Sequence, residues 1–241
     1  MDFNSAIPRT MAGRVGSQAI AEENRRFMIR VYNWMTAGLG LTGLVAWIVA
    51  RDPVMMQLIF GNKILLIGLV IAELGLVFWL AARVMQMSVM TAMSVFMGYS
   101  ALNGFTLSAI FVVYSTATIS SAFLVTAGTF ATMSFIGYTT KRDLTNLGGF
   151  LMMGLVGIII ASLVNFWFQS PMISWLVTYV GLFIFIGLTA YDTQKIKEMN
   201  IIGNEGTDED TKEAIRGALS LYLDFINMFL FILQIMGGNR D

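Results

Sequence analysis

The segment Gly217–Asn239, GALSLYLDFINMFLFILQIMGGN, is the last long apolar stretch of the chain, and it lies between Arg216 and Arg240. It is long enough to cross a bilayer as an α-helix, which takes about 20 residues. Its apolar body contains one charge, Asp224. A carboxylate in hydrocarbon costs at least about 2.5 kcal/mol on insertion scales, so such a residue usually faces protein or water and serves a function. We therefore expect a helical bundle built around this segment.

The composition indicates an integral membrane protein of the all-α class. Of the 241 residues, 56% are hydrophobic and 12% are charged, about half the charged fraction of a typical soluble domain. The extended polar segments are residues 1–30 and 192–216. We expect a cytoplasmic tail at 1–30 and a transmembrane domain at 31–241. The net charge is zero and no basic face interleaves with aromatics, so we expect no nucleic acid partner.

The chain contains neither cysteine nor histidine. The lack of cysteine excludes disulfides and thiolate metal sites. The lack of histidine removes the usual pH switch, so proton sensing near neutral pH would have to come from carboxylates. We expect no tightly bound cofactor.

Long apolar runs, most of them without charge, predict seven membrane spans. Residues 84–140 form a run of 57 residues without charge, which suits two crossings joined by a turn at Tyr114–Thr118. Residues 144–191 form a second such run of 48 residues, interrupted at Gln169–Pro171. All three prolines fall outside the resulting spans. The expected spans lie near 31–50, 64–82, 89–112, 119–139, 148–168, 172–191 and 217–239.

The distribution of basic residues predicts the orientation. With seven spans, one side of the membrane receives twelve Lys and Arg residues, whereas the other receives only Arg51, Lys63 and Arg240. Cytoplasmic connections carry an excess of Lys and Arg. We therefore expect a cytoplasmic N-terminus and a C-terminus outside.

Four ionisable residues fall inside or at the edge of these spans: Glu73, Arg83, Asp192 and Asp224. Asp192 ends the sixth span, and Asp224 lies eight residues beyond Arg216, about 12 Å along a helix. If the two aspartates meet in low dielectric they would share a proton, because both cannot ionise cheaply. Arg83 would balance their charge in one conformation and release it in another.

Simpler interpretations remain open for each carboxylate. Asp192 is also consistent with a helix-terminal residue paired with Lys195, and Asp224 with a hydrogen bond that serves packing alone. Glu73 either lines the same cavity as the aspartates or is protonated and bonded to a neighbouring helix.

Two motifs resemble those of the Bax inhibitor-1 family. They are Leu188–Lys197 (LTAYDTQKIK) and Leu219–Phe229 (LSLYLDFINMF), supported by Gly137–Asp143 (GYTTKRD). The resemblance covers most of the membrane part and is strongest to the bacterial branch. It implies seven helices with the last one central and a pH-sensitive calcium leak. It also implies that an aspartate pair, matching Asp192 and Asp224, forms the pH sensor, and that an arginine of the second helix, for which Arg83 is the candidate, acts at the gate.

Calcium would be the permeant ion, held transiently at Asp192 and Asp224. Calcium takes about six to eight oxygens, so water, carbonyls, Asn227, Asn103 or Glu73 would complete its shell. The acidic run at 204–210 is consistent with a solvated loop or a cation-collecting segment.

Three functions compete. The first is the pH-gated cation leak. The second, which the resemblance also implies, is a regulatory protein of the cell inner membrane that binds a membrane-anchored ATP-dependent protease or another partner. The third is an intramembrane aspartyl protease, but those enzymes carry Gly-x-Gly-Asp, whereas Asp224 follows Ser-Leu-Tyr-Leu. We therefore expect no enzymatic activity.

Overall fold

The computed structural model describes residues 9–238, and every regular element in that range is helical. Seven helical segments are long and apolar enough to cross a membrane, which confirms the predicted all-α polytopic fold. The helices are α1 (Arg9–Ala50), α2 (Pro53–Phe60), α3 (Lys63–Arg83), the short 3₁₀ helix η1 (Val84–Gln86), α4 (Val89–Leu107), α5 (Ile110–Val113), α6 (Thr116–Thr139), α7 (Thr145–Phe168), α8 (Pro171–Met199) and α9 (Asp208–Gly237).

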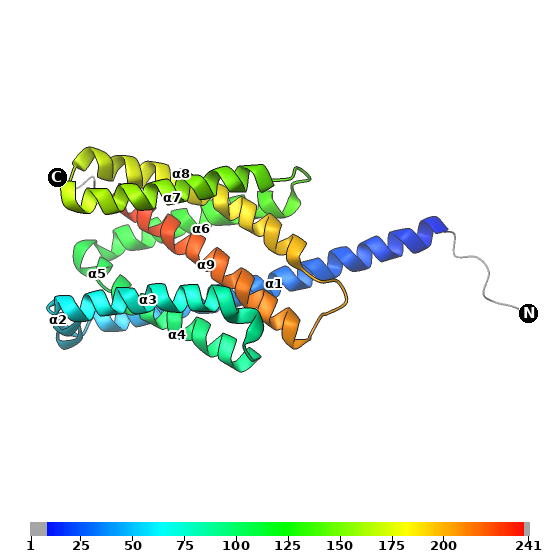
Figure 1. The fold of residues 1–241 in the computed structure, drawn as a ribbon, viewed down its shortest axis with the longest axis horizontal. Coiled ribbons are helices and arrows are strands. Elements are labelled where there is room, and N and C mark those ends of the chain that lie inside the picture. The colour runs from blue at the N-terminus through cyan, green and yellow to red at the C-terminus, as the bar shows by residue number, and fades with distance from the viewer. Residues whose placement is uncertain (1–8, 239–241) are drawn as a thin grey trace, which may run out of the picture.

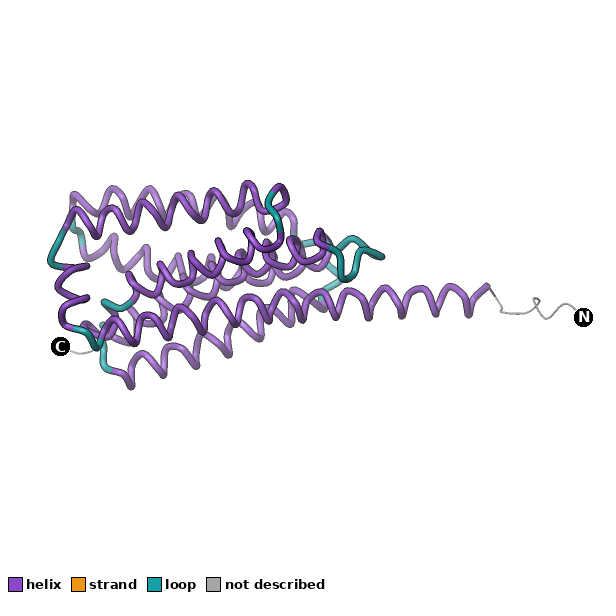
Figure 2. The backbone as a smooth tube through the Cα atoms, turned by 90° about the horizontal axis from the view of Figure 1, so that it is seen from below, coloured by secondary structure: helices purple, strands orange, loops and turns teal. Residues whose placement is uncertain are grey.

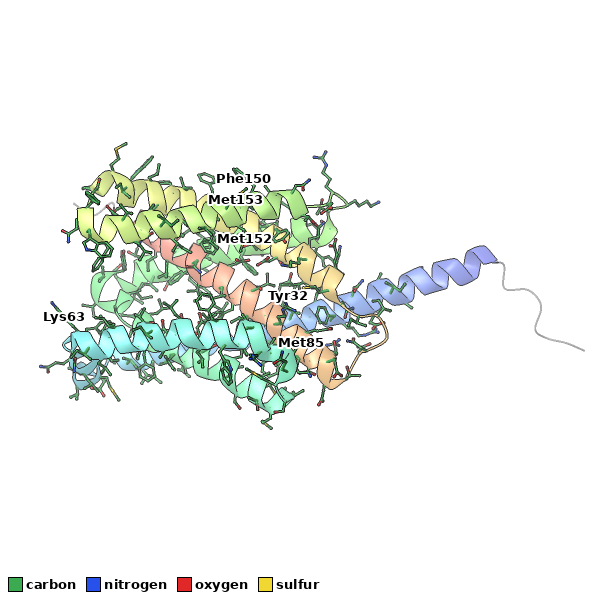
Figure 3. All side chains as sticks on the ribbon, in the orientation of Figure 1. Tyr32, Lys63, Met85, Phe150, Met152 and Met153 are labelled. Carbon is green, nitrogen blue, oxygen red and sulfur yellow. The ribbon has the colours of Figure 1, made fainter. Side chains whose placement is uncertain are left out.

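Helix α9 is the centre of the bundle, as predicted. It runs diagonally between the α7–α8 pair and the α3–α4 side of the molecule (Figure 1), and it packs against α1, α4, α6 and α8. In its apolar part 56% of residues are buried, against 6% in α3. The outer face of α7 is also exposed, and its residues Phe150 and Met153 point away from the bundle (Figure 3). Apolar side chains on that face suit contact with lipid.

The bundle has two distinct ends. The first part of α1 projects beyond the other helices at one end (Figure 2), which we call the tail end. The connections 84–88, 140–144 and 200–207 also lie there, whereas α2, α5 and the α7–α8 turn lie at the far end (Figure 1). The described chain therefore starts and finishes at opposite ends, as seven crossings require.

Polar residues at the turns explain why the helices stop where they do. Asp52 accepts hydrogen bonds from the amides of Val54 and Met55, so it caps α2, and Pro53 opens that helix. Ser115 caps α6 in the same way. The predicted turn near residue 114 is thus present, with the short α5 preceding it.

The predicted polar loop 192–216 is much shorter in the structure. Helix α8 continues to Met199 and α9 starts at Asp208, which leaves a loop of residues 200–207. The prediction ended helices where charges begin, but a helix that projects from a bilayer keeps its charged residues in water. Thr207 caps α9, and three acidic residues in the first turn of α9 interact favourably with the positive end of the helix dipole. Asp192 therefore lies inside a helix and not at its end.

The N-terminal boundary differs in the same direction. The predicted tail 1–30 is helical from Arg9 onward, and it continues without a break into the first span.

Close helix packing fixes the rotation of α8 just before Asp192. A Cβ atom added at Gly137 of α6 would overlap the backbone of Ala190, and one added at Gly148 of α7 would overlap the ring of Tyr191. Two successive residues of α8, Ala190 and Tyr191, thus contact two different helices so closely that neither glycine has space for a Cβ atom. This packing determines the direction in which Asp192 points.

Candidate functional site

Asp192 of α8 and Asp224 of α9 line one cavity of about 660 Å³. Its walls come from α7, α8 and α9 and are mainly apolar, and Met152 lies at its α7 side (Figure 3). Asn227, one turn beyond Asp224, lines it as well. The structure therefore brings to one cavity the two predicted aspartates and Asn227, one of the residues expected to complete the calcium shell.

Asp224 has an unusual environment. The residue is only 4% exposed, and its Oδ2 atom is buried without a hydrogen-bond partner in the described part of the chain. A buried polar atom without a partner costs about 1–3 kcal/mol, and more when it is charged. The side chain thus needs a proton, a water molecule or a cation from the cavity.

A second, smaller cavity of about 70 Å³ adjoins the first. Asp192 and Ser220 line both cavities, whereas Lys195 and Arg216 line only the small one. Asp192 and Ser220 therefore lie between a mainly apolar cavity along α7 and a small cavity with basic residues toward the tail end. Two basic side chains accompany Asp192 from this side.

Arg83, the predicted gate residue, lies elsewhere. It is exposed at the end of α3 and donates a hydrogen bond of 2.7 Å from Nη1 to Oε1 of Gln86. It lines neither cavity. The structure does not bring Arg83 to the aspartates, and the basic residues beside Asp192 are those that sequence reasoning left in the loop.

The remaining predicted residues are divided. Glu73 of α3 accepts a hydrogen bond of 2.8 Å from Thr106 of α4 and does not line the aspartate cavity. Asn103 is buried on α4, where its amide donates to the carbonyl of Tyr99. For Glu73 the structure thus supports the bonded interpretation.

A buried hydroxyl cluster on another face of α9 was not predicted. Thr42 of α1 contacts the Tyr222 hydroxyl of α9 at 2.8 Å and the Ser100 carbonyl of α4, also at 2.8 Å. Tyr222 is completely buried, with edge-to-face contacts to Phe96 and Tyr99. The signal for this cluster in the sequence was the presence of Thr42, Ser100 and Tyr222 within otherwise apolar runs. The cluster ties α9 to α1 and α4 two residues before Asp224.

Ion pairs bind α1 to the 200–207 loop and to the first turn of α9, and we call this set the α1 clasp. Arg26 holds Glu205 through two hydrogen bonds of 2.8 and 2.9 Å. Arg30 bridges Glu205 and Asp210, and Asp210 is 1% exposed. The hydrogen bond from Arg26 holds the pKa of Glu205 below its ordinary value of 4.5. The spacing of Arg26 and Arg30 by four residues, which puts them on one helix face, was the signal in the sequence.

Seven membrane-crossing helices, one of them central, with two carboxylates that line one cavity, define this chain as a multi-pass α-helical membrane protein. The family model described as inhibitor of apoptosis-promoting Bax1 matches residues 24–241. The chain therefore belongs to the Bax inhibitor-1 family, which confirms the resemblance seen in its motifs.

Bacterial relatives match over nearly their whole length. The inner membrane protein YbhL of Escherichia coli K12 is 53% identical over 215 residues, which cover 89% of this chain and 92% of that protein. An uncharacterised protein of Rickettsia prowazekii is 38% identical over 246 residues and covers both chains completely. An uncharacterised membrane protein of Streptococcus pyogenes is 37% identical over 217 residues, which cover 89% of this chain and 93% of that protein.

Proposed function

We propose that this protein is a pH-sensitive cation leak, with calcium as the permeant ion and Asp192 and Asp224 as a gate that shares a proton. The observation that supports it is the common cavity of the two aspartates, in which one Asp224 oxygen is buried without a partner. Protons and cations compete for such oxygens, so proton occupancy would control cation entry.

The path that we infer follows the two adjoining cavities. A cation would move between the large cavity and the small one past Asp192 and Ser220, which line both. We assign the tail end to the cytoplasm because it carries most of the basic residues. We infer an inner-membrane location with the N-terminus cytoplasmic and the C-terminus outside, and YbhL is named as an inner membrane protein.

Arg216 and Lys195 would act with the aspartates at this gate. Both line the small cavity beside Asp192. When Asp192 is ionised it balances their positive charge. When it takes up a proton, their uncompensated charge would repel a cation entering from this side. Arg83 would balance the charge of the aspartates, as predicted, only in another conformation that brings it to the small cavity.

Flux in proteoliposomes tests the leak. Calcium entry is followed with an enclosed fluorescent indicator over a pH series for the wild type, Asp192→Asn and Asp224→Asn. We expect each substitution to flatten the pH profile, because the shared proton is lost. Glu73→Gln is the matched control, since Glu73 is an intramembrane acid outside the cavity. An unchanged profile in both aspartate variants would exclude this function.

The same assay separates the two candidate arginines. We expect Arg216→Gln to change the pH profile and Arg83→Gln to leave it as in the wild type, because only Arg216 lines the cavity of Asp192. The reverse result would restore Arg83 as the gate residue.

One observation favours a second function, the binding of a regulatory partner. The first part of α1 projects past the bundle, where a membrane-anchored ATP-dependent protease or a similar partner would have access to it (Figure 2). Deletion of residues 1–17 leaves the α1 clasp intact. If the deletion abolishes a cellular phenotype while calcium flux persists, the regulatory function is supported; if the phenotype persists as well, it is not.

A further inference from the structure

The large cavity is acidic and offers mainly hydrogen-bond acceptors. The Ser162 hydroxyl donates to the Ile158 carbonyl at 2.7 Å, and one N–H of the Asn227 amide donates to the Leu223 carbonyl at 2.8 Å. The side-chain oxygens of both residues stay available as acceptors, whereas the second N–H of Asn227 and the hydroxyl of Ser220 are neutral donors in the lining. The carboxyl groups of Asp192 and Asp224 carry one negative charge when they share a proton and two when both are ionised. Within the described residues no Lys or Arg lines this cavity. The lining therefore favours a positively charged ligand that donates hydrogen bonds.

The remaining wall is apolar and opens sideways. Ile159, Leu163 and Phe166 line the cavity along α7, and they are exposed on the outer face of the bundle, Leu163 by 59% and Phe166 by 74%. In a membrane protein that face is covered by lipid, not by water. From Met152 to Phe166 the α7 wall extends for about 21 Å at 1.5 Å per residue. The cavity thus has a carboxylate floor and a long apolar side accessible from the bilayer.

We propose that this cavity binds a lipophilic primary amine, with the ammonium group at Asp224 and Asp192 and a single alkyl chain along α7. An ammonium group supplies three donors and one positive charge, which matches the acceptors of the floor. The volume of about 660 Å³ falls within the range of about 300–1,000 Å³ that small-molecule sites occupy.

The charge of the cavity selects against ordinary lipids. A phospholipid would bring its phosphate toward two carboxylates, in a cavity whose described lining has no basic side chain to receive it. A fatty acid would meet the same repulsion. A neutral alcohol would supply a single donor and no charge. The amine is therefore the occupant that the floor and the wall accept together.

This site lies in the cavity that the proposed function assigns to ion passage, but the binding of an amine does not require the protein to conduct. A bound amine would occupy the oxygens that a cation uses, so it would act as a blocker of the leak. Binding and flux are therefore measured separately.

Dodecylamine is the probe. The binding of radiolabelled dodecylamine to the full chain in nanodiscs is measured at neutral pH, with empty nanodiscs subtracted and with dodecanol and dodecanoate as competitors. We expect one saturable site per chain for which neither competitor is effective. Asp224→Asn should weaken the binding by about tenfold or more, because a charged hydrogen bond is worth about 1.5–3 kcal/mol.

Two further variants keep the result interpretable. Leu163→Trp narrows the exposed side of the cavity without touching the carboxylates, and it should also weaken binding. Glu73→Gln removes an acid outside the cavity and should leave the affinity unchanged. Size-exclusion profiles confirm that each variant is folded, and Asp192→Asn replaces Asp224→Asn if the latter is not.

The outcomes distinguish this site from the leak. Three results would overturn the amine site. The first is an absence of saturable binding to the wild type, and the second is wild-type affinity in both the aspartate variant and Leu163→Trp. The third is a loss of affinity in Glu73→Gln as large as that in the aspartate variant. Calcium flux without amine binding would overturn the amine site and leave the leak intact. Amine binding without calcium flux would support the site and exclude the leak.

Discussion

Helices α9 and α3 each carry one acid within an apolar span, and the two acids differ in almost every other respect. Asp224 lies on the central helix, is 4% exposed, and has an oxygen without a partner at a cavity. Glu73 lies on a helix that is largely exposed on the surface of the bundle, and Thr106 donates a hydrogen bond to it. The same sequence signal thus marks a buried acid with an unpartnered oxygen in one helix and a hydrogen-bonded acid in the other. What separates them is the position of the helix in the bundle, which the span itself does not reveal.

The largest effect should come from breaking the packing of α6 against α8, the helix that carries Asp192 to the cavity it shares with Asp224. We expect Gly137→Val to destabilise the protein by about 3 kcal/mol, because its Cβ would overlap the backbone of Ala190, which cannot rotate away. Thermal unfolding in detergent measures the change. Gly128→Val on the same helix is the control, since its Cβ would meet nothing within 4 Å. Equal losses in both variants would refute the packing argument.

The acids themselves should respond differently to replacement by leucine. Asp224→Leu removes a buried polar group without a partner, so we expect stabilisation by about 1–3 kcal/mol together with loss of pH sensitivity. Glu73→Leu should change stability by less than about 1 kcal/mol, because Glu73 has a partner and Thr106 retains its contact with the Asn103 carbonyl. Chemical denaturation followed by tryptophan fluorescence tests both. If Asp224→Leu is strongly destabilising, Asp224 is a packing residue and the contrast fails.

The smallest effect concerns an acid outside the spans. The pKa of Glu205 is held below its ordinary value of 4.5 by Arg26. A lowered pKa in the folded state stabilises the fold above the unfolded value, and this contribution is lost as the pH falls through the folded value. We expect the protection of the 200–207 amides, measured relative to their intrinsic exchange rates, to fall below about pH 4.5. Glu205→Gln should show low protection at every pH, whereas Glu198→Gln should behave as the wild type.

Much of the fold follows from where charges are missing. Long apolar runs predict all seven spans, five without a charge and two with one acid each, because an apolar helix is the form in which a chain satisfies its backbone in lipid. A single acid within a span indicated a central helix correctly for 217–239, but the same pattern in 64–82 belongs to a helix on the surface of the bundle. The pairing of Asp192 and Asp224 in one cavity was predicted by motif resemblance together with burial cost.

What could not be predicted lies where helices leave the bilayer. Charge is a stop signal for a span but not for a helix, so the ends of α8 and α9 and the start of α1 were placed too close to the apolar runs. The same error left Lys195 and Arg216 in a loop, although both lie on helices beside Asp192. Arg83 was chosen by its place in the second span, which carries no information on the direction in which its side chain points.

The central position of α9 has a consequence for how the membrane protein is made. A ribosome releases the seven spans in order, so α1 to α8 must enter the bilayer before the helix that they enclose exists. The contact between Thr42 and Tyr222 joins residues 180 positions apart, and the clasp between Arg26 and Glu205 joins residues 179 apart. Neither can form until translation is almost over. A nascent chain that stops before α9 would leave its inner polar groups facing lipid or one another. Such exposed polar groups distinguish the incomplete bundle from the finished protein for membrane quality control.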